Sequence, residues 1–356
     1  MDTIRTLVSA GTVVGCILAF TLATVADDLA PTADNSGVLT ADGEQQLWSS
    51  ARPDGHAPIG VMGDHTHSRG EWMASVRYMY MFMNGNQGRG GNKSTSDVLD
   101  DYPVAPKDMT TNMVMFGMMN APTDDLTFMV MVPYIFKEMS HRTRANTSFT
   151  THTDGVGDIK LNSLYKILNW SRQQIHLNAG ISLPTGSIDE TDDTPGGDVI
   201  LPYPMQLGSG TFDLLPGLTY NGQTDNWSWG SQLLGTVRLG RNDRGYSLGE
   251  RGQLTAWGAR KWTRWLSTSV RLNGQVWGDI DGEDDALNPA LVPTADPRRR
   301  AGERIDFLAG VNIYGRESWY RGQRVAVEFG FPIYQALDGP QLGLDWVLVT
   351  GWQYAW

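Results

Sequence analysis

The chain has 356 residues, a formal net charge of −11 and a single cysteine, Cys16. The acidic balance argues against nucleic acid as a partner, because nucleic-acid binding favours a basic face. The rest of the chain can form neither disulfides nor thiolate metal sites. Its 13 Trp and 41 Gly residues indicate many strands and turns, with aromatic side chains at an interface.

The first 26 residues are typical of an export signal. Arg5 supplies a positive charge, residues 7–22 are apolar, and small residues up to Ala26 offer a cleavage site. We therefore expect a cleaved signal peptide at 1–26.

Two alternatives remain for this segment. Residues 6–26 are nearly long enough to be retained as a membrane helix, and Cys16 lies in a sequence that loosely resembles a lipidation site. After cleavage, we expect residues 27–69 to form a largely irregular periplasmic segment.

From residue 70 onward, apolar and polar side chains alternate with a period of two, which predicts β-strands. The clearest case is 126–139, where one face is a continuous apolar stripe of Leu126, Phe128, Val130, Val132, Tyr134 and Phe136. Eleven further strands are predicted at 71–83, 109–120, 157–168, 174–184, 211–220, 227–239, 250–260, 266–278, 304–314, 324–332 and 343–356. Their lengths suit tilted membrane strands of roughly 9–11 residues plus their ends.

The connections between these segments alternate between short and long. Outer-membrane barrels have short periplasmic turns and long external loops, with both termini in the periplasm. Residues 70–356 are therefore predicted to form an all-β fold, a closed antiparallel transmembrane β-barrel of about twelve strands in an up-and-down meander.

Tryptophan positions and the C-terminus support the same fold. Nine Trp residues fall at predicted periplasmic ends, namely Trp72, Trp170, Trp227, Trp229, Trp262, Trp265, Trp319, Trp352 and Trp356. Amphipathic rings collect at membrane interfaces. The aromatic end of the chain resembles the C-terminal signal of outer-membrane proteins, which usually ends in Phe. We expect a bacterial outer-membrane location, with lipid, lipopolysaccharide and the barrel-assembly machinery as partners.

Three motifs resemble outer-membrane transporters grouped under the "MetA-pathway of phenol degradation" family. They are Gly155-Val156-Gly157-Asp158-Ile159-Lys160-Leu161, Leu183-Pro184-Thr185-Gly186-Ser187 and Gly208-Ser209-Gly210-Thr211-Phe212-Asp213. The resemblance covers residues 70–356 and implies a porin-like barrel that passes small molecules, aromatic ones among them.

Charged residues on polar strand faces should line the lumen, because charges facing lipid near the midplane are costly. These pore-lining candidates are Arg77, Lys160, Arg238, Arg271, Arg304, Asp306, Arg324, Glu328 and Asp345. They could pair with one another structurally or guide an ionic solute.

The methionine and histidine residues suggest an alternative function, the binding or passage of metal ions. Thioether sulfur is a soft ligand for Cu(I), and histidines spaced by two can chelate Cu(II), Ni(II) or Zn(II). The candidate ligands are His65, His67, Met79, Met81, Met113, Met115, Met129 and Met131. The simpler interpretation is that the Met side chains fill space in a narrow barrel and that the histidines lie in a solvated linker. No other cofactor is expected.

The sequence contains no nucleophile-elbow motif and no metalloprotease helix signature, so we expect no enzyme. Passage of a small solute is the leading functional hypothesis. The alternatives are a Met- and His-rich barrel that binds or passes soft metal ions, and a closed structural barrel.

Overall fold

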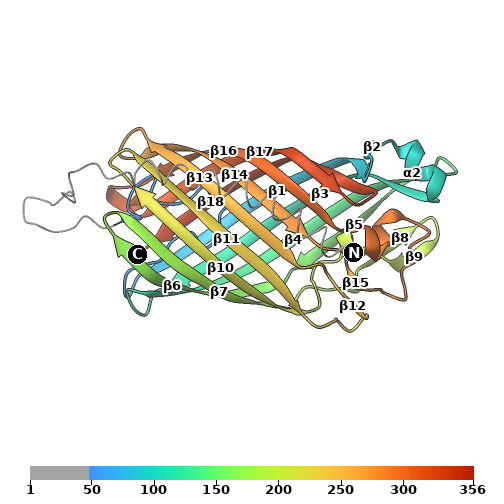
Figure 1. Ribbon diagram of the computed structural model, residues 1–356, viewed down its shortest axis with the longest axis horizontal. Helices are drawn as coiled ribbons and strands as arrows, with labels where there is room; N and C mark the ends of the chain where they lie inside the picture. The colour runs from blue at the N-terminus through green and yellow to red at the C-terminus, as the bar shows by residue number, and fades with distance from the viewer. Residues whose placement is uncertain (1–47) are drawn as a thin grey trace, which may run out of the picture.

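In the computed structural model, twelve long antiparallel strands wrap into a closed barrel, and the structure describes residues 48–356 (Figure 1). The strands are β1 (Trp72–Gly88), β3 (Val104–Asn120), β4 (Leu126–Thr143), β6 (Ile159–Trp170), β7 (Gln173–Leu183), β10 (Phe212–Gln223), β11 (Trp227–Leu239), β13 (Arg251–Lys261), β14 (Leu266–Trp277), β16 (Gly302–Tyr314), β17 (Gln323–Leu337) and β18 (Gln341–Ala355).

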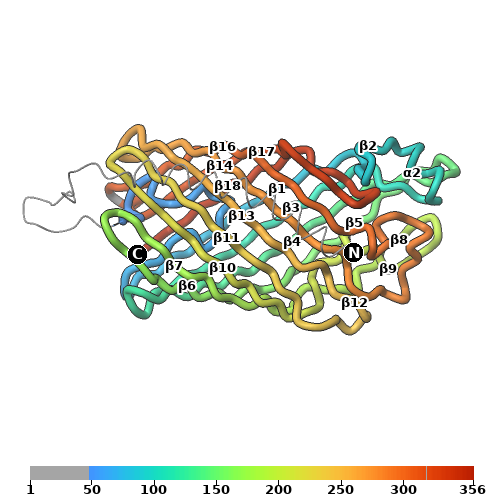
Figure 2. Tube along the Cα trace, in the orientation of Figure 1, coloured from blue at the N-terminus to red at the C-terminus, as the bar shows by residue number. Residues whose placement is uncertain are grey.

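Each of these strands pairs with the next along the chain, and β18 pairs back onto β1. Figure 2 shows this closure, with the red end of the chain beside the blue beginning of the barrel. The predicted meander of about twelve strands is confirmed. The predicted signal peptide at 1–26, Cys16 and the first part of the 27–69 segment lie outside the described residues.

Small elements decorate one end of the barrel, which we call the loop end. They are β2 (Gly91–Lys93), α2 (Thr95–Asp101), β5 (Ser148–Val156), β8 (Thr191–Thr194), β9 (Gly197–Ile200), η1 (Tyr203–Met205), β12 (Tyr246–Ser247), β15 (Asp281–Gly282), η2 (Pro293–Ala295) and η3 (Pro297–Arg299). A capping box between Ser94 and Asp97 begins α2. Within residues 48–356, no helix is both long and apolar enough to cross a membrane.

Several strands run further toward the loop end than their alternation predicts. β3 begins at Val104 rather than 109, and β17 continues to Leu337 rather than 332. The predicted loop before 157 also contains β5, which pairs with residues 134–142 in the loop-end half of β4. A strand alternates between apolar and polar side chains only where one of its faces contacts lipid or an apolar core. The extensions toward the loop end therefore show no alternation in the sequence.

Burial follows the alternation along the strands. On β4, Phe128, Val130 and Phe136 are exposed on the outer face, whereas Met129 and Met131 are buried inside. An apolar exterior around a largely polar interior is the pattern of a membrane-spanning barrel.

The opposite end, which we call the turn end, carries short turns, the last 3₁₀ element η4 (Ser318–Tyr320) and the C-terminus. The backbone N–H of Trp72 donates to the Trp356 carbonyl at 3.0 Å, which places both residues there. Eight of the nine Trp residues assigned to this end are exposed, as interfacial aromatics should be. The ninth, Trp229, is half-buried, and its Nε1 donates to the Tyr220 hydroxyl at 3.2 Å.

Candidate functional site

Residues 49–67, which we call the plug, run through the turn-end half of the barrel lumen. Side chains from strands around the barrel hold the backbone of the plug. Its carbonyl oxygens accept hydrogen bonds from Gln223 at Ser49, Arg324 at Ala57, Gln232 at Met62, Asn178 at Gly63 and Asn221 at Asp64. Buried backbone groups need such partners, so an irregular segment can be stable here only because the lumen is rich in amides.

This position corrects one expectation. The histidines before β1 do not lie in a solvated linker, because His56, His65 and His67 are all buried. The segment itself carries no periodic pattern that could have indicated its place. The inward-facing Asn and Gln residues of β7, β10 and β11 are the signal that sequence reasoning missed.

A buried ion pair supports the middle of the plug. Arg271 and Glu328 make two contacts of 2.8 Å, and both side chains are less than 5% exposed. The backbone N–H of Gly60 donates to the Glu328 carboxylate at 3.1 Å. A Cβ on Gly60 would lie 2.5 Å from atoms of both Arg271 and Glu328, so only glycine lets the plug approach the pair this closely.

Four of the predicted lumen charges lie at the level of the plug. Arg271 and Glu328 form the pair just described, and Arg324 donates to the Ala57 carbonyl at 2.6 Å. Arg77 contacts the Met62 sulfur through its guanidinium group. At this level the charges hold the plug in place, which matches the structural-pairing alternative.

Three more predicted residues line a cavity in the loop-end half of the lumen: Lys160, Arg238 and Arg304. Arg304 pairs with the predicted Asp306 at 2.8 Å, and Arg238 pairs with Asp213.

Asp345, the ninth candidate, does not line the lumen, and this prediction is wrong. Its side chain is exposed because β18 has a bulge there, where the register passes from Phe82↔Trp346 to Met83↔Leu344. A bulge inserts a residue and shifts the alternation.

The lumen cavity has a volume of about 630 Å³.

 A separate hollow of about 990 Å³ lies outside the lumen, among exposed loop residues such as Arg241 and Asp281.

Methionines form one wall of the lumen cavity. Met81, Met83, Met113, Met115 and Met131 line it from the neighbouring strands β1, β3 and β4. This wall is apolar and adaptable in shape, because Met side chains are flexible and polarizable.

Basic side chains outnumber acidic ones in the rest of the lining. Arg238 on β11 and Arg251 on β13 lie across the barrel from the methionine strands, as the strand order requires. The lining contains six basic residues, Lys137, Lys160, Arg238, Arg251, Arg300 and Arg304, against two acidic ones, Asp158 and Asp213. Sequence reasoning missed Arg251 at the start of a weakly patterned strand and Arg300 in a loop.

A loop closes part of the outer side of the lumen cavity. Tyr203, Pro204 and Gln206 line the cavity, and the Lys137 ammonium donates to the Pro204 carbonyl at 2.8 Å and to the Gln206 carbonyl at 2.5 Å. Lys137 therefore fastens the loop over the methionine side.

The six candidate methionines do not form one continuous cluster. Met115, Met129 and Met131 pack together with Met113 and with Met62 of the plug. Met79 and Met81 instead pack against Ile59 of the plug and its neighbours. Met62 and Ile59 of the plug thus occupy much of the space beside the methionines in which a metal ion was considered.

The candidate ligands His65 and His67 are adjacent, with ring centroids 4.8 Å apart. His65 Nδ1 lies 2.9 Å from the Asp64 carboxylate, and His67 Nδ1 lies 3.4 Å from Glu71. Burial lowers the pKa of His67 and of the neighbouring His56, which favours their neutral forms.

Solved structures with a similar fold include an outer-membrane channel. The COG4313 outer membrane channel from Pseudomonas putida F1 is 14% identical, with a TM-score of 0.60 over 83% of this chain and 99% of that chain. More distant matches are a Pseudomonas aeruginosa FadL homologue (TM-score 0.40, 12% identity, 86% and 93% covered) and the KdgM porin (TM-score 0.36, 10% identity, 79% and 98% covered).

No protein-family model and no curated protein sequence matches the chain. The resemblance to the phenol-degradation family therefore stays a prediction. At this level of identity, the similarity to the Pseudomonas putida channel shows a shared barrel fold.

Proposed function

We propose that this chain is an outer-membrane channel that admits small solutes with an apolar body and a negatively charged group. The observation that carries the proposal is the lumen cavity, with methionines on one wall and an excess of basic residues on the others. Its volume of about 630 Å³ is in the range of small-molecule sites, roughly 300–1,000 Å³.

The chemistry of the two walls favours this class of solute. Thioether groups make favourable contacts with aromatic rings, and guanidinium and ammonium groups bind carboxylates and sulfonates through charge-assisted hydrogen bonds. Within residues 48–356, the Lys160 ammonium makes no hydrogen bond or ion pair, so it is available to an anion. Small aromatic acids fit both walls and agree with the solutes that the family resemblance implies.

The topology gives the route a direction. Outer-membrane barrels keep short turns and termini in the periplasm, so the lumen cavity would lie on the external side and the plug on the periplasmic side. Complete passage requires the plug to shift, because it fills the turn-end half of the lumen.

Uptake into proteoliposomes tests the proposal. Benzenesulfonate and benzyltrimethylammonium have similar size but opposite charge, and we expect faster uptake of the anion. A K160Q/R251Q variant should lose most of this preference, whereas R264Q, in the exposed turn after β13, should keep it. Equal uptake of both ions contradicts the proposed selectivity for anions. No uptake of either ion contradicts a channel and leaves the closed structural barrel.

A soft-metal channel is the second candidate, because Met113, Met115, Met129 and Met131 pack together. Replacing these four with Leu keeps volume and apolarity. The metal candidate requires Ag(I) binding to fall in this variant while the barrel still folds. Unchanged binding would leave packing as the role of the cluster.

The remaining functional expectations belong to the same proposal. We propose that the aromatic C-terminal strand, ending in exposed Trp356, is the part recognised by the barrel-assembly machinery, and that lipopolysaccharide contacts the loop end. We propose no catalytic role. A Trp356→Ala variant should accumulate less folded barrel in the outer membrane, as measured by heat-modifiable gel mobility.

A further inference from the structure

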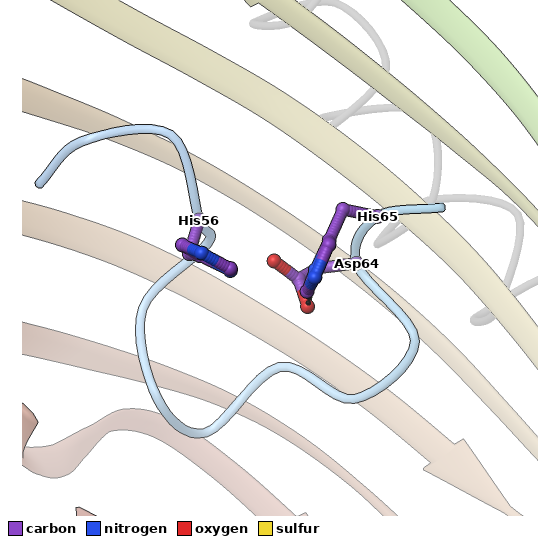
Figure 3. Close-up of side chains that lie close together, drawn as sticks. All are labelled: His56, Asp64 and His65. Carbon is purple, nitrogen blue, oxygen red and sulfur yellow. Dashed lines mark hydrogen bonds and ion pairs between the residues drawn. The ribbon is translucent and has the colours of Figure 1, made fainter. Parts of the chain in front are cut away.

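Three side chains of the plug converge although they come from two separate parts of it. His56 lies before the bend at Gly60, and Asp64 and His65 lie after it. One potential ligand atom of each residue lies within 4.8 Å of the other two, and all three side chains are buried. Figure 3 shows them meeting inside the loop that the plug makes within the barrel.

The hydrogen bonds of this cluster leave nitrogen atoms free. A carboxylate can only accept, so His65 Nδ1 must donate to the Asp64 oxygen 2.9 Å away. In the neutral ring, the form that binds a metal, His65 Nε2 then carries a lone pair, and it is buried without a hydrogen-bond partner within the described residues, as is His56 Nδ1. Buried polar atoms nearly always have a partner, and a bound ion or water is a common partner of those that lack one in the protein.

The arrangement of Asp64 and His65 is the one that metal-binding histidines commonly have. A ligating imidazole usually donates its other N–H to a carboxylate, which fixes the tautomer and the orientation of the ring. The second Asp64 oxygen accepts from the backbone N–H of Ala57 at 2.8 Å, so the carboxylate is itself held in place. His67, whose ring centroid is 4.8 Å from that of His65, lies close enough to supply a further nitrogen.

We propose that His56 and His65 bind one divalent transition-metal ion of the Zn(II) or Cu(II) type within the plug, with the Asp64 carboxylate holding the imidazole of His65 in place. Imidazole suits these ions, whereas Mg(II) and Ca(II) prefer oxygen ligands. Ligands of a tetrahedral Zn(II) ion lie roughly 3.3 Å apart, given bonds of about 2.0–2.1 Å. The two histidine side chains would therefore adjust slightly on binding.

The surrounding charges narrow the class of ion further. Arg77 on β1 and Arg324 on β17 both lie near Asp64 and interact with it electrostatically. A hard cation bound mainly by carboxylate charge would be disfavoured beside two guanidinium groups. A site in which neutral imidazoles supply the main bonds tolerates them better. Because the ligands lie on both sides of Gly60, the bound ion would tie the plug into its bent form.

Metal binding to the refolded full-length mature chain tests this proposal. Zn(II) is added during refolding, excess metal is removed, and bound zinc is measured per barrel. We expect one Zn(II) per barrel, retained in the presence of excess Mg(II). H56Q and H65Q should each lower the affinity at least tenfold. H141Q, at a buried histidine stacked on Phe149, and H152Q, at an exposed one, should not.

A second measurement on the unmodified chain covers the case in which these variants fail to fold. Zn(II) should protect His56 and His65 from diethylpyrocarbonate, read residue by residue by mass spectrometry, and should leave His152 reactive. Absence of bound zinc overturns the proposal and points to ordered water at the free nitrogens. Zinc that remains bound in folded H56Q and H65Q, or that protects His152 instead, also overturns it.

Discussion

The two halves of the barrel lumen are built from the same kind of strands but are filled differently. In the turn-end half, charged and amide side chains hold the plug through hydrogen bonds. Arg271, Glu328 and Arg324 all have partners at hydrogen-bond distance there. In the loop-end half, Lys160 and Arg251 face an open space beside methionines. A lumen charge therefore supports the plug where it meets the plug, and under the proposed function the unpaired Lys160 at the cavity is available to a solute.

The largest expected effect on stability comes from breaking the ion pair in the turn-end half, next to the plug. E328A leaves the buried Arg271 guanidinium unpaired, and we expect the free energy of unfolding to fall by about 3–5 kcal/mol. Denaturant unfolding in detergent micelles measures it. The R271M/E328L double variant should recover most of the loss, because two apolar side chains replace the pair. A loss below about 1 kcal/mol in E328A would show that the pair does not support the plug.

A smaller effect is expected where the plug crosses the ion pair. G60A places a methyl group against Arg271 and Glu328, so we expect a destabilisation of about 1–3 kcal/mol and a displaced plug. Planar-bilayer recordings should show higher conductance than the unmodified chain. The matched control is G258A on β13, where a Cβ meets no atom within 4 Å. Equal conductance in both variants would contradict a plug that blocks the lumen.

The smallest effect on stability is expected in the cavity half. Arg251 is accessible to solvent in the lumen cavity, so R251Q should change the free energy of unfolding by no more than about 0.5 kcal/mol. Uptake of benzenesulfonate should nevertheless fall several-fold. A variant that loses stability without losing uptake would reverse the roles assigned to the two halves.

Much of the barrel could be predicted from the sequence, because a lipid-facing strand imposes a strict period of two. The stripe at 126–139 and the girdle of Trp residues follow directly from that constraint. The same rule placed Lys160 and Arg324 inside. It failed at Asp345, because a bulge changes the alternation without any mark in the local sequence.

The plug could not be predicted in the same way. Residues 49–67 have no regular secondary structure, so their position depends on contacts with residues far away in the chain, such as Asn221 and Gln232. The approach of His56 to His65 depends in turn on the bend of the plug. The histidine spacing alone suggested His65 and His67 as the pair, whereas the structure adds His56 and Asp64.

Ion selectivity in planar bilayers tests the central claim most directly. With a gradient of sodium benzenesulfonate across the membrane, the reversal potential gives the permeability of the aromatic anion relative to sodium. We expect a ratio above one for the unmodified chain and a ratio closer to one for K160Q/R251Q. A ratio below one, or a ratio that does not change in the variant, would contradict a lumen cavity that selects small apolar anions.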